Sequence, residues 1–340
     1  MGNKRLGLLS VLVLTLTVLA GCNGQAEDDV PLRLGYFPNL THAPAFVGVS
    51  EGYFQDELGE AELQTFNFNA GPEAVEALFS SALDMSFIGP NPAINAFAES
   101  DGEAIRIVAG TTSGGAFLVA RDGIEAPSDL AGTKISTPQL GNTQDVALRW
   151  WLEEQGFTTT LEGGGDVEIL PQANAQILET FISGEIDGAW VPEPWATRMQ
   201  LEGGGHVLVD EADLWENGQF VTTHLIVRTE FMEQHPNEVS AVLRGLVDAV
   251  DFLHGDAATA KQAFNDHLAE LTAKPLPQET LEAAWENLEF TVDPIASSLR
   301  VSAEHAEAVG LLDPVDLDGI YSLDLLNGYL VEAGRDEVSS

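Results

Sequence analysis

The sequence predicts an α/β protein of two lobes, and three observations support this prediction. The chain has 340 residues, of which 44% are hydrophobic, so it can bury more than one core. Short apolar runs alternate with helical patterns as far as residue 227. Such alternation is typical of parallel or mostly parallel sheets covered by helices. It occurs in two successive series, and each series predicts one lobe.

The two series predict the elements of the lobes in order. The first series has strands at 32–37, 63–68, 85–88 and 105–109, with helices at 44–54 and from Glu73 and Asn91. The second has strands at 117–120, 134–136, 167–170, 189–191 and 207–209, with helices at 144–155, 175–183 and from Pro194. A last strand is expected at 221–227. Almost only helix follows, at 242–253, 263–271, 281–288 and 303–309. We expect these C-terminal helices to pack on the first lobe.

The N-terminus has the features of an export signal. Lys4 and Arg5 precede an apolar run of about 14 residues, which is shorter than the roughly 20 that span a bilayer. The run ends in Leu-Ala-Gly-Cys, which resembles the lipoprotein box of bacteria. We therefore predict a signal peptide over residues 1–21, lipidation of Cys22 and a tether over residues 22–30. The alternative is plain secretion with Cys22 as a free thiol. Since Cys22 is the only cysteine, disulfides and zinc–cysteine sites are excluded.

The charge excludes nucleic acid as a partner. Acidic residues number 54 against 14 basic ones, and the formal charge is −40, or −42 once Lys4 and Arg5 leave with the signal. Such a surface repels itself in dilute buffer, whereas near 1 M salt the Debye length falls to about 3 Å. We interpret the composition as adaptation to a salty environment. The alternative is an ordinary acidic secreted protein.

Metal and catalytic motifs are missing from the sequence. The seven histidines form no pair at helical spacing with an acid, so a metal site is not expected. The sequence contains no phosphate-binding loop and no Gly-x-Gly-x-x-Gly, and we identify no nucleophile with a base beside it. The sequence therefore favours a binding protein over an enzyme, and no cofactor is expected.

Polar residues gather where predicted strands lead into helices. In open α/β sheets ligands bind at these strand ends, and free N–H groups at helix starts attract anions. The candidates that share this placement are Asn39, Thr41, His42, Asn91, Asn142, Thr143 and Gln144, to which we add Ser113 in a predicted turn at 111–115. Each has a simpler alternative, because Asn142 or Thr143 can cap its own helix and Ser113 can serve the turn alone.

The stretch GAWVPEPW adds three further candidates: Trp190, Glu193 and Trp195. Its Pro-x-Pro resembles that of residues 90–92, which places Asn91 and Glu193 at equivalent strand ends. Glu193 can meet an ammonium group of a ligand, with the two tryptophans as cation–π walls. Alternatively, Glu193 stabilises its own helix dipole and the tryptophans belong to the core.

The chain resembles a family of transport receptors. The segments ALFSSALDMSFIGPNPAINAF, IRIVAGTTSGGAFLVARDGI, DLAGTKISTPQLGNTQDVALRWWLEEQGF and VEILPQANAQILETFISGEIDGAWVPEPWATR are similar to the substrate-binding proteins of nitrate, sulfonate and taurine ABC importers. The resemblance implies a type II periplasmic-binding fold with crossover segments near 117–121 and 221–228. The lobes are then residues 31–117 plus 226–340 and residues 118–225.

The resemblance also implies a function. The protein is expected to be a monomeric receptor that captures a small sulfonate-type anion, or a zwitterion such as taurine, between its lobes and delivers it to an ABC permease. The lipid at Cys22 would hold it on the outer face of the cell membrane. Nitrate, bicarbonate and a thiamine-pyrimidine precursor are alternative ligands. Two other classes are an enzyme like thiamin-pyrimidine synthase and a structural lipoprotein.

Overall fold

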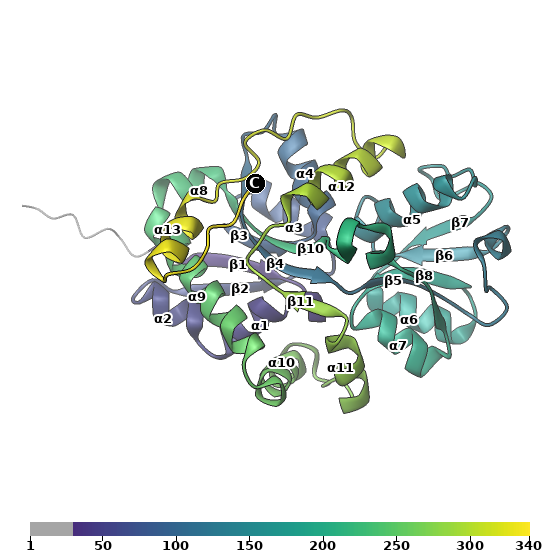
Figure 1. Ribbon diagram of the computed structural model, residues 1–340, viewed down its shortest axis with the longest axis horizontal. Helices are drawn as coiled ribbons and strands as arrows, with labels where there is room; N and C mark the ends of the chain where they lie inside the picture. The colour runs from purple at the N-terminus through teal and green to yellow at the C-terminus, as the bar shows by residue number, and fades with distance from the viewer. Residues whose placement is uncertain (1–29) are drawn as a thin grey trace, which may run out of the picture.

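Two sheets, each with its own helices, form the two lobes of the protein (Figure 1). The computed structural model describes residues 30–340, so the predictions of a signal peptide, of lipidation at Cys22 and of nearly all of the tether concern residues outside this range. The first sheet has the strand order β11-β4-β10-β3-β1-β2, and the second has the order β7-β6-β8-β5-β9. In Figure 1 the first sheet lies on the left and the second on the right. The prediction of a two-lobed α/β fold is confirmed.

The first sheet is parallel on one side and antiparallel on the other. β1 (Leu32–Tyr36) pairs in parallel with β2 (Leu63–Asn67) and β3 (Met85–Ile88). β10 (Val221–Arg228) runs antiparallel between β3 and β4 (Ile105–Gly114). The helices of this part are α1 (Ala43–Ser50), α2 (Tyr53–Leu58), α3 (Gly71–Phe79) and α4 (Pro90–Glu99). The single helix expected at 44–54 is thus two helices, because Gly52 between them is left-handed.

The second sheet repeats the arrangement on a smaller scale. β6 (Lys134–Thr137) pairs in parallel with β7 (Glu168–Pro171) and β8 (Gly188–Pro192). β5 (Ala116–Ala120) runs antiparallel between β8 and β9 (His206–Asp210). The helices here are α5 (Thr143–Glu154), α6 (Asn174–Ser183) and α7 (Trp195–Gly203). Every strand and helix expected in this lobe is present, with ends shifted by one or two residues.

The chain crosses between the lobes a few residues away from the expected places. Residues 117–120 and 221–228 are central strands of the two sheets, not connections. The outward crossing is made at Gly114 and Gly115, with φ of +78° and +72°, a conformation that side chains disfavour. The N–H of Gly114 donates to the carbonyl of Phe220 on the returning segment, at 3.3 Å. The predicted turn at 111–115 is therefore limited to its two glycines, and Ser113 belongs to β4.

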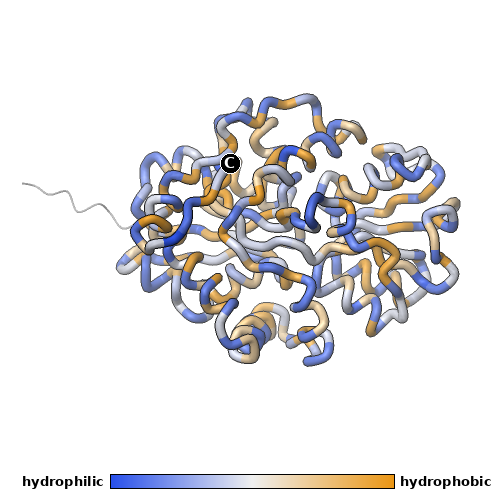
Figure 2. The backbone as a smooth tube through the Cα atoms, in the orientation of Figure 1, coloured by the Kyte–Doolittle hydropathy of each residue, from blue (hydrophilic) through white to orange (hydrophobic). Residues whose placement is uncertain are grey.

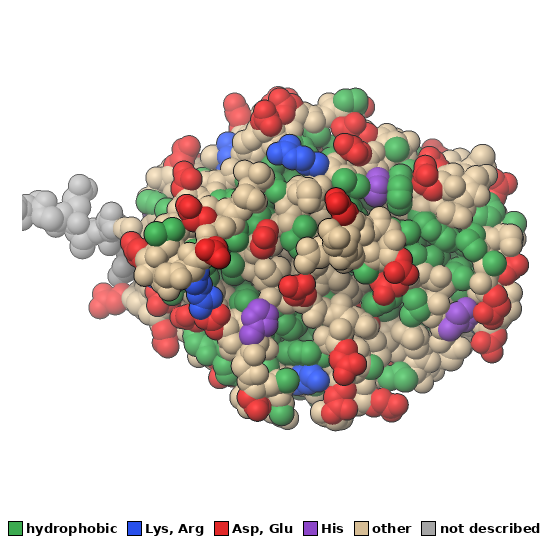
Figure 3. Space-filling view, in the orientation of Figure 1, with side chains coloured by type: hydrophobic (Ala, Val, Ile, Leu, Met, Phe, Trp, Pro, Cys, Tyr) green, Lys and Arg blue, Asp and Glu red, His purple; other side chains and the backbone are tan. Residues whose placement is uncertain are grey.

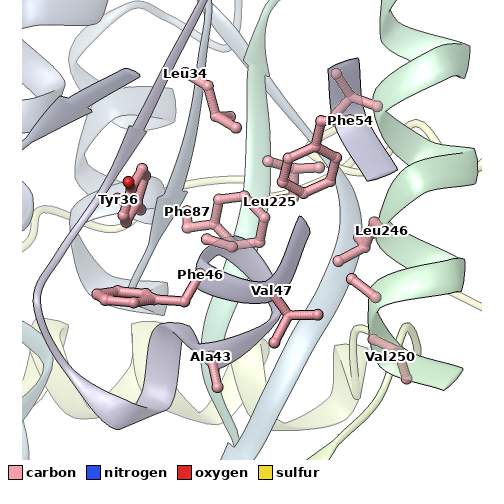
Figure 4. Close-up of a cluster of buried hydrophobic side chains, with 14 of the residues drawn as sticks. Leu34, Tyr36, Ala43, Phe46, Val47, Phe54, Phe87, Leu225, Leu246 and Val250 are labelled. Atoms are coloured by element: carbon pink, nitrogen blue, oxygen red, sulfur yellow. The ribbon is translucent and has the colours of Figure 1, made fainter. Parts of the chain in front are cut away.

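The core of the first lobe explains why its helices form where they do. The longest helix, α9 (Pro236–His254), buries an apolar stripe that includes Val242, Leu246 and Val250. Figure 4 shows Leu246 and Val250 of α9 facing Val47 and Phe54 of the N-terminal helices. In Figure 2 orange and blue segments alternate along the helices of both lobes, as expected of helices that bury one apolar face.

The C-terminal helices only partly follow the prediction. α8 (Thr229–Gln234), α9, α10 (Ala257–Thr272) and α13 (Asp324–Glu332) cover the first lobe. α11 (Gln278–Trp285) also contacts α7, and α12 (Ala296–Ala308) contacts α5, so both reach the second lobe. The expected helix at 281–288 ends early, because β11 (Leu288–Phe290) pairs with the edge of the first sheet.

Acidic residues are dispersed over the surface of the protein. Figure 3 shows red acidic groups over the whole visible face and few blue basic ones. Within residues 30–340 no helix is long and apolar enough to cross a membrane.

Candidate ligand-binding site

A small polar cavity lies where the two lobes meet. We call it the interlobe cavity; its volume is about 20 Å³. On this measure a cavity of about 10–15 Å³ already holds one water molecule. The residues that line it come from both lobes: Phe37, Asn39, Thr41, His42, Asn69, Ala70, Gly89 and Thr222 from the first, and Asn142, Thr143, Gln144, Asn174 and Pro192 from the second.

The second-lobe wall consists of two helix starts. Asn142 precedes α5, and among residues 30–340 its side chain makes no capping hydrogen bond. The first N–H groups of any helix lack an intrahelical acceptor, and in α5 these belong to Thr143 and Gln144. Thr143 Oγ1 and Asn174 Oδ1 are buried without a hydrogen-bond partner in the described part of the chain. Since buried polar atoms are nearly always paired, these two atoms are available to a ligand or a water in the cavity.

The first-lobe wall presents a neutral histidine. His42 Nδ1 accepts the N–H of Phe37 at 3.3 Å, which leaves the ring proton on Nε2 as a donor. Burial lowers the pKa of His42 to about 3, so the ring is uncharged at neutral pH. It lies against Phe37, with ring centroids 4.5 Å apart. His42 thus supplies a hydrogen-bond donor without a positive charge.

Direct contacts join the lobes around the cavity. Trp195 Nε1 donates to Asn39 Oδ1 at 2.8 Å, and the Leu40 N–H donates to the carbonyl of Glu193 at 3.1 Å. Farther out, Gln139 Nε2 donates to Glu73 Oε1 at 3.1 Å. Gly89 has no room for a side chain, because a Cβ there would lie 2.4 Å from Thr143 Oγ1. The lobes are therefore closed onto one another at this place.

A larger chamber adjoins the cavity. It has a volume of about 460 Å³ and shares Asn39, Asn69 and Asn174 with the interlobe cavity. Its walls are largely apolar: Leu178 and Ile182 of α6, Trp195 of α7, and Leu268, Pro275, Leu276 and Pro277 of the first lobe. Charged groups that line it include Arg198, which lies over the Trp195 ring at 5.0 Å, and Lys274.

Glu193, predicted as a partner for a ligand amine, does not line the cavity. The side chain is fully buried, and its Oε2 accepts the N–H of Thr197 at 3.1 Å. Its Oε1 accepts Thr197 Oγ1 at 2.8 Å and Asn287 Nδ2 at 2.7 Å. Burial raises the pKa of Glu193, which these hydrogen bonds partly offset. Glu193 stabilises the first turn of α7 and binds it to the first lobe.

Three other candidates do not line the cavity. Trp190 is in the core of the second lobe, where its Nε1 donates to Glu211 at 2.7 Å. Asn91 Nδ2 donates to the carbonyl of Ser302 on α12 at 3.1 Å. In these two cases another segment of the chain uses the group that was expected to meet a ligand. Ser113 lies in β4, paired on both sides within the first sheet. Trp195 lines the chamber instead of the cavity.

The sequence analysis missed several lining residues. Asn174 begins α6 after β7, in the same way as Asn142 precedes α5, and this signal was overlooked because the helix was expected to begin at Ala175. Asn69 follows β2, so the rule that selects polar residues at strand ends would have identified it too. Thr222 and Pro192 lie within strands, and no local pattern distinguishes them from core residues.

The cavity is electrically neutral. Among the lining residues, all of which lie in the described part of the chain, none carries a charge at neutral pH. Its donors are amides, hydroxyls, His42 Nε2–H and helix-start N–H groups, which together bind an anion without a cation. The same residues give no cluster of metal ligands, and none occurs elsewhere in residues 30–340.

Comparison with known proteins gives the family of this chain. The NMT1-like family model matches residues 25–267. The chain belongs to the NMT1-like family. It is 29% identical over 210 residues to the taurine-binding periplasmic protein of Escherichia coli K12, a match that covers 61% of this chain and 62% of that protein. It is 27% identical to the putative aliphatic sulfonates-binding protein of Bacillus subtilis 168, with 83% and 82% covered.

The fold of this NMT1-like chain is shared with receptors of another ligand class. The periplasmic nitrate-binding protein NrtA from Synechocystis PCC 6803 superposes with a TM-score of 0.75 at 16% identity, covering 90% of this chain and 89% of that one. The predicted family of importer receptors and the predicted periplasmic-binding fold are confirmed. The fold alone does not select between a sulfonate and an inorganic anion.

Proposed function

We propose that the protein is an extracytoplasmic receptor for a small organic anion of the sulfonate type, which it carries to an ABC permease. The observation that carries this proposal is the pairing of a neutral, donor-rich cavity with an apolar chamber beside it. The donors around the cavity suit an anionic head, and the apolar walls of the chamber suit a carbon chain. Relatives with names that specify taurine and aliphatic sulfonates support the same ligand class.

Export and lipid attachment belong to the same proposal. The relatives named above include a periplasmic protein, and the N-terminal sequence carries an export signal followed by Leu-Ala-Gly-Cys. We propose that Cys22 is lipidated, that the receptor is a monomer tethered to the outer face of the membrane, and that it works at high salt. Mass spectrometry of the membrane fraction tests the lipid directly.

A second candidate is a receptor for nitrate or bicarbonate. The small volume of the interlobe cavity favours it, as does the structural likeness to the nitrate receptor. Taurine is a third possibility within the sulfonate class, although its ammonium would not reach Glu193. Of the charged groups lining the chamber, Glu179 is available to such an amine.

A thermal-shift screen near 1 M salt distinguishes these ligands. A ligand that binds the native state alone raises stability by RT ln(1 + [L]/Kd). We expect butanesulfonate to raise the melting temperature more than nitrate or bicarbonate does, because only butanesulfonate fills the chamber. A larger shift with nitrate would favour the second candidate. No shift with any of these anions or with taurine would reject the proposal.

A further inference from the structure

A buried ion pair lies directly behind the second-lobe wall of the cavity. Asp145 and Arg149 are one helical turn apart in α5, with Arg149 Nε 3.0 Å from Asp145 Oδ2. It is the only ion pair with two fully buried partners within residues 30–340. Neither side chain lines the cavity. Because burying two charges is costly, such a pair needs a reason beyond stability.

Asp145 organises the loop that leads into the site. Its Oδ1 accepts Thr137 Oγ1 at 2.8 Å, and its Oδ2 accepts the N–H of Gly141 at 3.0 Å. One carboxylate therefore holds both the end of β6 and the residue before Asn142. Arg149 in turn is anchored by Nη1, which donates to the carbonyl of Thr160 at 2.6 Å. The pair fixes the position of the first turn of α5 relative to the sheet.

The same carboxylate creates an electrostatic problem for anion binding. Asp145 is the third residue of α5, immediately after Thr143 and Gln144, which line the cavity. An anion in the cavity would lie close to a second negative charge inside the protein, where the effective dielectric constant is far below that of water. Arg149 is the cation that offsets this charge. Its Nη2 is buried and has no hydrogen-bond partner in the described part of the chain, so Asp145 and Thr160 do not exhaust its donors.

We propose that Arg149 is a positioning residue for the anion: it cancels the charge of Asp145 behind the cavity and, through Asp145, holds the loop that presents Asn142, Thr143 and Gln144. This inference rests on the proposed function, because it requires the ligand to be an anion. It assigns no direct ligand contact to Arg149.

The test is a double-mutant cycle on Arg149 and Asp145. The affinities of the variants for butanesulfonate, taurine and nitrate are measured by calorimetric titration near 1 M salt. Arg149→Gln leaves Asp145 uncompensated, and we expect affinity to fall about 10- to 100-fold. Arg149→Lys retains the charge but not the fork that reaches both Asp145 and Thr160, so we expect it to lose less affinity than Arg149→Gln does. Asp145→Asn combined with Arg149→Gln removes both charges, and we expect it to recover most of the lost affinity. Arg335→Gln, which breaks an exposed pair with Asp251 on the first lobe, is the matched control.

The outcomes separate this inference from the proposed function. If the wild type binds none of the three anions, the proposed function fails and the inference fails with it. If the wild type binds but Arg149→Gln binds equally well, or the double variant recovers nothing, only the inference is overturned. Should Arg149→Gln fail to fold, the double variant decides. An affinity within about 3-fold of the wild type supports the inference, and a loss of about 10-fold contradicts it.

Discussion

Two pairs of helix starts, similar in sequence, have different roles in this protein. α4 begins with Pro-x-Pro and α7 follows it, and the polar residues between the prolines, Asn91 and Glu193, bind Ser302 and Asn287 of the C-terminal region. α5 and α6 follow or begin with asparagine, and Thr143 Oγ1 and Asn174 Oδ1 remain unpaired beside the interlobe cavity. The first pair holds the fold together, and the second pair is proposed to bind the ligand.

A polar residue at a helix start is therefore not by itself a ligand contact. What decides its role is whether another segment of the chain reaches it first. Asn287, between α11 and β11, and Ser302, in α12, are more than 90 residues away in sequence from the groups they bind.

The largest effect is expected at Glu193. Glu193→Ala leaves the N–H and Oγ1 of Thr197 and Nδ2 of Asn287 without their acceptor in a fully buried place. We expect the free energy of unfolding to fall by about 3–4 kcal/mol. Denaturant titration near 1 M salt measures it. Glu193→Gln should weaken taurine and butanesulfonate equally, and a selective loss of taurine would restore the amine-binding role.

The next largest effect is expected at Glu211, which accepts a hydrogen bond from Trp190 Nε1. Trp190 lies in β8, the strand that leads to Glu193. Burial raises the pKa of Glu211 to about 7 from an unfolded value near 4.5. The native state therefore favours the protonated form, whose contribution to stability is present below about pH 4.5 and lost as pH rises through 7. We expect Glu211→Gln to match the wild type near pH 4.5 and to exceed it by about 3 kcal/mol at pH 8. Equal stabilities at both pH values would contradict the raised pKa.

Two buried asparagines give the most direct comparison. Asn174→Ala should reduce affinity for butanesulfonate about 10-fold and leave stability nearly unchanged. Asn91→Ala should do the opposite, costing about 1 kcal/mol of stability through the lost hydrogen bond to Ser302. Calorimetric titration and denaturant unfolding of both variants measure the two quantities. If both variants lose affinity equally, the distinction between the two kinds of helix start is wrong.

The smallest effect is expected at a contact between the lobes outside the cleft. His305 of α12 stacks on Trp150 of α5, with ring centroids 3.6 Å apart, and lies 5.6 Å from Trp215. Burial lowers the pKa of His305 to about 4, so it is neutral at pH 7. His305→Ala removes a contact of the closed arrangement, and we expect affinity to fall about 3-fold through a smaller closed population. A change in tryptophan fluorescence without any change in affinity would show that this stack does not contribute to closure.

The sequence predicted the lobes well because each depends on local alternation of apolar runs and helical patterns. The short strands 85–88 and 134–136 were found from a few apolar residues. β11 was missed because its three residues form a strand only through pairing with β4, which is distant in the sequence. The crossings, which the resemblance implied near 117–121 and 221–228, lie a few residues away, because both segments pair as central strands of their sheets.

The site was predicted in part. Asn39, Thr41, His42, Asn142, Thr143 and Gln144 line the cavity, as strand-end positions suggested. Trp190 and Glu193 do not, because their partners Glu211, Thr197 and Asn287 satisfy them inside the fold. Asn174 was missed by one position. Local pattern therefore locates the edge of the sheet at which a ligand binds, while tertiary contacts decide which side chains remain free to bind it.

The central claim is that the unpaired groups at the starts of α5 and α6 bind an organic anion between the lobes. Thr143→Val tests it most directly, because valine has nearly the shape of threonine and Thr143 Oγ1 has no partner in residues 30–340. We predict that affinity for butanesulfonate, measured by calorimetric titration, falls about 10-fold while the free energy of unfolding stays the same or rises. Unchanged affinity in a stable Thr143→Val protein would contradict the claim.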